Sequence, residues 1–109
     1  MTQAEAYPTA GTVTNLRLAY GSSMVSELSN SPNPFAEFTT VSFTLEATTT
    51  ATLLVQNLQG QLIRSYEIEG VAGLNRQTIT RADLGGVTGV LTYTVVADGY
   101  TATKQLVVR

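Results

Sequence analysis

An all-β domain is what the sequence predicts, on three observations. Threonine occurs 18 times in 109 residues, alongside many Val, Ile and Tyr, and such β-branched and aromatic side chains fit the pleated surface of a sheet. Apolar residues alternate with polar ones in several short segments that turn residues separate. No helical pattern of apolar residues lies between these segments. With 43% hydrophobic and 13% charged residues, the chain is long enough for one core and one domain.

The start of the chain is predicted to lie outside this domain. Residues 12–20 alternate imperfectly and form a candidate strand, either of this domain or of an upstream one. Residues 21–34 hold five Ser, two Asn and two Pro, a composition typical of loops. We therefore expect residues 1–30 to be an N-terminal linker or the remnant of an upstream domain, and residues 31–109 to be the folded domain. Residues 1–7 lack the features of a secretory signal, so the chain looks like a piece of a longer protein.

The domain is expected to open with a stiff, polyproline-like lead. Pro32 and Pro34 lack an N–H group and push the residues before them towards extended geometry. Phe35 follows directly and is available to anchor this lead to the core.

Two strands follow in close succession. Residues 39–46 alternate with the period of two that a strand with one buried face requires, and residues 51–55 repeat the pattern. A turn at residues 57–60 ends the second strand, because Gly60 can adopt a positive φ without steric cost. The side chains predicted to point inward are Val41, Phe43, Leu45, Ala51, Leu53 and Val55.

The remaining segments complete the sheet pattern. Residues 62–69 and 74–80 are predicted strands, and the first has Leu62, Tyr66 and Ile68 on one side. A glycine-rich loop at 83–89 precedes a strand at 90–97, and Asp98 with Gly99 suits a two-residue hairpin turn before a last strand over 100–108. Further inward residues are Leu91, Tyr93, Val95, Leu106 and Val108.

Six strands and a candidate seventh, without helices, indicate an immunoglobulin-like antiparallel β-sandwich of about seven strands; the related fibronectin type fits equally. The Cys-Trp-Cys core of antibody domains is absent, since the chain has no Cys and no Trp.

The sequence contains few of the residue types that enzymes use for catalysis. The absence of His and Cys excludes the commonest general base, the thiol nucleophile and most zinc sites. Glu67 and Glu69 share a strand face, which we interpret as a solvated polar edge, and no Asp-x-Asp cluster provides calcium ligands. We expect no enzyme activity, no cofactor and no metal.

Other binding functions find little support. The glycines at 85–89 precede a strand, whereas a phosphate-binding loop opens a helix. Six basic against eight acidic residues exclude a nucleic-acid partner. The residues Tyr66, Tyr93 and Tyr100 occupy positions compatible with the core, so they predict packing rather than a sugar-stacking platform.

The last strand runs to the final residue, which suggests a C-terminus that another protein recognises, because chain ends usually fray. Together with four earlier segments, it resembles the type A C-terminal sorting domain of type IX secretion cargo, over about residues 30–109. The matching segments are residues 31–35 (Ser-Pro-Asn-Pro-Phe), 39–45, 55–61, 89–93 and 103–108. The chain departs from the family pattern at Gln56, where Tyr is common, at Leu91, and in a longer loop at 84–89.

The resemblance implies a non-catalytic domain that targets its passenger across the outer membrane. The cargo would cross the inner membrane by the general secretory route, engage the outer-membrane type IX translocon, and be cleaved by a sortase-like peptidase within the stretch from residue 21 to 31. The passenger would then be secreted or held at the cell surface. The residues that the resemblance and the terminal strand assign to recognition and sorting are Pro32, Asn33, Pro34, Asn57, Gly60, Gly89, Lys104, Leu106, Val108 and Arg109.

Two alternative functions and one assembly state accompany this hypothesis. An ancillary fibronectin-like spacer would tolerate loss of its last residues, and a carbohydrate-binding module would show a concave aromatic face. An open sheet edge, in the terminal strand or in residues 12–20, predicts a weak homodimer by strand pairing.

Overall fold

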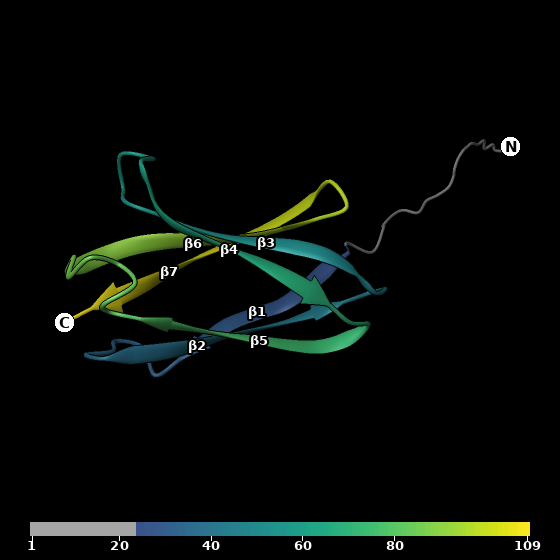
Figure 1. The fold of residues 1–109 in the computed structure, drawn as a ribbon, viewed down its shortest axis with the longest axis horizontal. Coiled ribbons are helices and arrows are strands. Elements are labelled where there is room, and N and C mark those ends of the chain that lie inside the picture. The colour runs from purple at the N-terminus through teal and green to yellow at the C-terminus, as the bar shows by residue number, and fades with distance from the viewer. Residues whose placement is uncertain (1–23) are drawn as a thin grey trace, which may run out of the picture.

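The computed structural model describes residues 24–109, so the candidate strand at 12–20 lies outside the described residues. Within that range the chain forms antiparallel strands and no helix, and the predicted all-β sandwich is confirmed (Figure 1). The strands are β1 (Val25–Ser31), β2 (Phe38–Leu45), β3 (Thr49–Gln56), β4 (Leu62–Gly70), β5 (Gly73–Thr80), β6 (Gly89–Ala97) and β7 (Tyr100–Val108).

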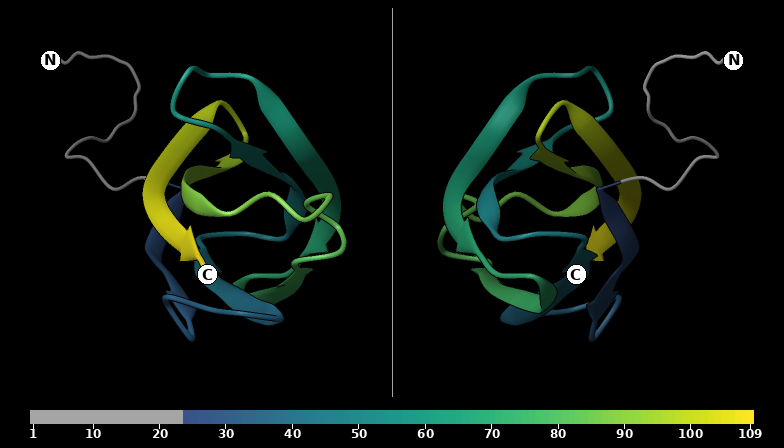
Figure 2. Two further views of the ribbon diagram at one scale, coloured as in Figure 1. Left: turned by 90° about the vertical axis from the view of Figure 1, so that its left-hand side faces the viewer. Right: turned by 90° about the vertical axis from the view of Figure 1, so that its right-hand side faces the viewer.

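The strands divide into a three-stranded sheet, in the order β1-β2-β5, and a four-stranded sheet, in the order β4-β3-β6-β7. In constant-type immunoglobulin domains the fourth strand joins the sheet of the first, second and fifth. Here β4 lies beside β3 because the short turn between them makes the two strands a hairpin. Figure 2 shows the two sheets curving around a common interior.

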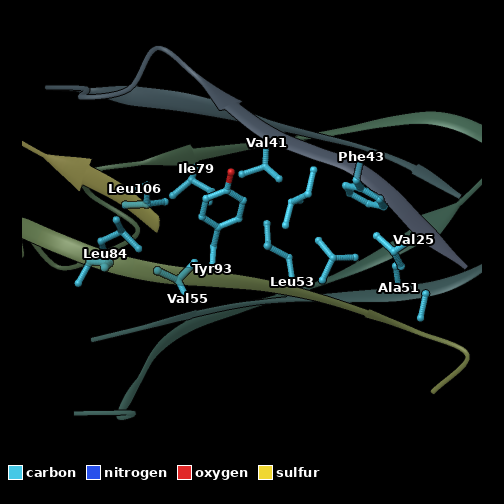
Figure 3. Packing of buried hydrophobic residues seen from close by; sticks show 14 of the residues in the cluster. Val25, Val41, Phe43, Ala51, Leu53, Val55, Ile79, Leu84, Tyr93 and Leu106 are labelled. Atoms are coloured by element: carbon cyan, nitrogen blue, oxygen red, sulfur yellow. The ribbon is translucent and has the colours of Figure 1, made fainter. Parts of the chain in front are cut away.

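The core fills the space between the sheets (Figure 3). The eight residues at the centre of the predicted core are all at most 2% exposed, so this prediction is confirmed. They are Val41, Phe43, Leu53, Val55, Tyr93, Val95, Leu106 and Val108. Phe35 is 1% exposed, as expected for an anchor, and Leu84 closes the core from the loop after β5.

Strand β1 occupies part of the segment that was predicted to be a loop, and that prediction is wrong. A bulge between Ser26 and Ser29, with Glu27 at a φ of 55°, places Val25 and Leu28 in the core three residues apart. Alternation with a period of two is therefore absent from the sequence, and the many serines conceal the strand. Within the described residues the sandwich thus starts at Val25, whereas the sequence predicted a folded domain from residue 31.

Leu62, predicted on the same side as Tyr66 and Ile68, and Tyr100, given a position compatible with the core, are both exposed. The pairing of β3 with β4 shifts after Val55, so that Leu62 pairs with Gln56 on the outer face and is 56% exposed. Ile63 packs against the core instead, together with the half-buried Tyr66 and Ile68. Tyr100 is also exposed, since it begins an edge strand directly after the hairpin turn.

Candidate recognition site

Most of the residues assigned to sorting gather at one end of the sandwich, which we call the distal end. It comprises the segment 32–37, the β3–β4 turn at 57–61, the loop at 81–89 and residues 107–109. The chain enters β1 at the opposite, proximal end (Figure 1). The left view of Figure 2 looks onto the distal end, where the β5–β6 connection crosses the opening of the sandwich.

The Pro-Asn-Pro segment and the end of β7 bind each other there. Asn33 Oδ1 accepts a hydrogen bond of 2.9 Å from the backbone N–H of Val107. The N–H of Phe35 donates to the Val107 carbonyl at 3.0 Å, and the N–H of Arg109 donates to the Phe35 carbonyl at 2.8 Å. Phe35 and Val108 thereby form a parallel bridge. We call these residues, Asn33, Phe35 and Val107 to Arg109, the terminal clasp.

The lead into the clasp is not polyproline-like. Residues 32–34 bend, and the Ser31–Pro32 and Asn33–Pro34 peptide bonds are both cis. This bend lets Asn33 and Phe35 meet β7 after the chain has left its pairing with β2 at Ser31.

A part-buried network of hydrogen bonds supports the bend, and the sequence did not reveal it. The Tyr93 hydroxyl donates to Asn30 Oδ1 at 3.0 Å, and Asn30 Nδ2 donates to Thr39 Oγ1 at 3.1 Å. Thr39 Oγ1 in turn donates to the Pro32 carbonyl at 2.8 Å. Burial raises the pKa of Tyr93 to about 12, so its hydroxyl stays protonated and acts as a donor. The buried hydroxyls of Tyr93 and Thr39 thus each have a hydrogen-bond partner, as burial demands.

Asn57 uses its side chain to build its own turn. Its Oδ1 accepts hydrogen bonds of 2.9 Å from the N–H groups of both Gln59 and Gln61. Its Nδ2 donates to Gln61 Oε1 at 2.7 Å, and Gly60 sits at a φ of 85°. The predicted turn is confirmed, and Asn57 and Gly60 shape the surface rather than offering free groups to a partner.

Gly89 and the loop before it close the distal end. Gly89 pairs with Val108 at a φ of 102°, a backbone conformation that favours glycine. Asp83 fixes the loop to β4, since its Oδ2 accepts a 2.9 Å hydrogen bond from the Tyr66 hydroxyl. Burial, with help from this bond, raises the pKa of Tyr66 well above its ordinary value.

The sorting residues of β7 have different environments. Leu106 and Val108 are buried in the core, so their side chains support the fold instead of facing a partner. Lys104 is exposed but pairs with Tyr93, which places it on the core-facing side of an edge strand. Arg64 has the equivalent position on β4, the other edge of that sheet. Inward-pointing charges on edge strands hinder pairing with another chain.

The carboxylates do not gather into a site. Within residues 24–109 no three His, Cys, Asp or Glu side chains lie close enough to hold a metal ion together. Glu67 and Glu69 are exposed on the edge strand β4, and Glu67 Oε2 accepts a hydrogen bond from Thr52 Oγ1 at 3.1 Å. No helix in this part of the chain is long and apolar enough to cross a membrane.

The fold and the clasp define a small immunoglobulin-like module whose first and last segments meet at one end. The model of the secretion system C-terminal sorting domain family matches residues 31–109, and the chain belongs to this family. The resemblance inferred from the sequence is thereby confirmed. The chain is a sorting signal of type IX secretion. This secretion pathway exports its cargo across the outer membrane to the cell surface or the medium. No curated protein matches the chain.

The terminal clasp gives a first testable prediction. Replacing Asn33 with Ala removes the acceptor for the Val107 N–H and should cost about 1 kcal/mol of unfolding free energy. Amide exchange at Val107 should accelerate, and urea titration should show the loss of stability. Asn33→Asp keeps the acceptor and serves as the control. Unchanged exchange at Val107 in Asn33→Ala would contradict the clasp.

Proposed function

We propose that this domain is a non-catalytic sorting signal that the outer-membrane type IX translocon recognises in its folded form. One observation carries the proposal: the first and last motifs of the family match form a single unit at the distal end. A signal assembled from both ends of a domain exists only in the folded state. The translocon would therefore recognise a surface rather than a linear sequence.

The assigned residues would contribute to this signal in different ways. Pro32, Pro34, Lys104 and Arg109 are exposed and are the proposed contacts. Asn33, Asn57, Gly60 and Gly89 would shape the surface through their hydrogen bonds and backbone conformations. Leu106 and Val108 would hold β7 in place from the core.

We further propose that a sortase-like peptidase releases the passenger by cutting before Val25. Residues 25–31, within the stretch first considered, are paired with β2, and Val25 and Leu28 are buried. Peptidases need accessible, extended backbone, so a cut inside β1 would require the strand to detach first. Cleavage upstream of β1 leaves the sandwich intact.

A weak homodimer by strand pairing would use β7, one edge of the four-stranded sheet. The clasp occupies residues 107–109, and Lys104 faces inward, so only the start of β7 offers a free edge. We therefore propose only weak, concentration-dependent association. Sedimentation velocity that detects monomer alone at high concentration would exclude it.

A fusion tests the sorting proposal directly. The full chain, placed behind a periplasm-targeted reporter in a host with the type IX apparatus, should carry the reporter to the cell exterior. The same fusion in a host that lacks the translocon should remain in the periplasm. If the folded fusion stays in the periplasm of both hosts, the sorting proposal fails and the spacer function takes its place.

A further inference from the structure

The distal end carries apolar side chains that the core does not use. Leu58 is 61% exposed in the β3–β4 turn, and Leu62 follows at the start of β4. Val90 is 40% exposed near the start of β6 and pairs with the half-buried Val107 of β7. We call Leu58, Leu62, Val90 and Val107 the distal apolar surface.

Strand geometry places Leu62, Val90 and Val107 on the outside of the four-stranded sheet. Val107 lies between the buried Leu106 and Val108 and therefore points outward, as does its partner Val90. Leu62 pairs with Gln56, which follows the buried Val55 and also points outward. Along β3, β6 and β7 none of the outward side chains is charged, and Gln56, Thr92 and Gln105 lie between the apolar residues.

Charge is distributed unevenly along the sandwich. The proximal half of the described residues carries five carboxylates against one cation, Arg76. The carboxylates are those of Glu27, Glu46, Glu67, Glu69 and Asp98. The distal end has Arg64, Arg81 and Arg109, and one of its two carboxylates, Asp83, is bound by Tyr66. Arg109 follows Val107 by two residues on β7 and is the cation beside the distal apolar surface. Arg64 pairs with Val55 on the core-facing side of β4, and its guanidinium lies over the Tyr66 ring, 5.5 Å from the ring centroid.

We propose that the distal apolar surface, with Arg109 beside it, docks a protein of the export machinery whose own surface is apolar and bordered by carboxylates. This inference rests on the proposed sorting function and names the surface and the partner chemistry. The guanidinium groups of the distal end attract such a partner, while the proximal carboxylates are repelled by it. The domain therefore approaches with its distal end first and its passenger behind.

A protein partner fits this surface better than a lipid does. Amide and hydroxyl groups of Gln56, Thr92 and Gln105 are interspersed with the apolar side chains. Burying such groups in hydrocarbon without hydrogen-bond partners is unfavourable, whereas a protein surface supplies donors and acceptors. Interfaces of this kind combine an apolar centre with a polar rim.

Paired substitutions in the full-length reporter fusion test the surface. Leu58→Ser with Leu62→Ser should lower export at least tenfold. The matched control is Val71→Ser with Leu74→Ser, a turn residue and a strand residue of similar exposure, 52% and 53%, at the proximal end. Because all four side chains are exposed, both double variants should melt as the parent does. Likewise Arg109→Glu should lower export, and Arg76→Glu, halfway along β5, should leave it unchanged.

The outcomes separate this inference from the sorting proposal itself. If the parent fusion is not exported, the sorting proposal fails. If the parent is exported and the distal variant is exported equally, or if the proximal control falls as far, the docking surface is wrong. Co-sedimentation of the chain with lipopolysaccharide micelles that Leu58→Ser with Leu62→Ser abolishes would assign the surface to lipid and overturn the protein partner.

Discussion

Phe43→Ala should destabilise the domain by about 3–5 kcal/mol, the range found for deleting a fully buried Phe. Phe43 is 0% exposed and projects from β2 into the space between the sheets (Figure 3). Its loss leaves a cavity in a close-packed core, which the opposing strands cannot fully collapse to fill. Since domains of this size are stable by only about 5–15 kcal/mol, the melting temperature should fall by at least about 12 °C.

Phe38→Ala is the matched control for this prediction. Phe38 lies on the same strand but is 52% exposed, so its truncation should cost less than about 1 kcal/mol. Thermal melts followed by circular dichroism measure both variants. A Phe43→Ala variant that melts at the parent temperature, or a spectrum dominated by helix, would contradict the structure.

Deleting residues 104–109 should abolish export of the reporter. The deletion removes Leu106 and Val108 from the core, the outer half of the terminal hairpin and the β7 side of the terminal clasp. Each buried side chain contributes about 1.5–3 kcal/mol, so the truncated domain should also lose most of its stability. Export of the reporter and the melting temperature of the purified domain are the two measurements.

Single substitutions separate recognition from folding in that experiment. Lys104→Ala and Arg109→Ala remove exposed side chains and should leave the melting temperature unchanged while lowering export. Arg76→Ala, an exposed cation on β5, is the control that should change neither. A truncated chain that is exported as well as the full one would eliminate the terminal strand from the signal.

The parts of the fold that the sequence predicted are those with regular pairing. In β2, β3 and β6 the apolar residues recur every second position without interruption, so inward and outward faces follow from the sequence alone. Strand β1 and the start of β4 contain register shifts, where an extra residue breaks the alternation of inward and outward side chains. A bulge depends on the partner strand, and a single sequence does not display the partner.

The site was predictable as a set of residues but not as an arrangement. Asn57 and Gly60 have a local turn signature, and the structure places them in that turn. Asn33 and Val107 are 74 positions apart, and no local pattern signals their hydrogen bond. The half-buried Asn30 was predicted to lie in a loop, and no local pattern signals the hydrogen bonds of the buried Thr39, because these partners come from a distant strand and a carbonyl.

The terminal clasp also has a consequence for timing. A polypeptide that emerges from a ribosome or a membrane channel with its N-terminus first presents Asn33 long before Val107. The distal end can therefore be assembled only after nearly the whole domain has emerged, and a chain interrupted at any earlier point lacks the strand that Asn33 and Phe35 bind. If the translocon recognises this folded surface, as we propose, the clasp makes the signal a check on completeness, because cargo terminated before Val107 cannot form it.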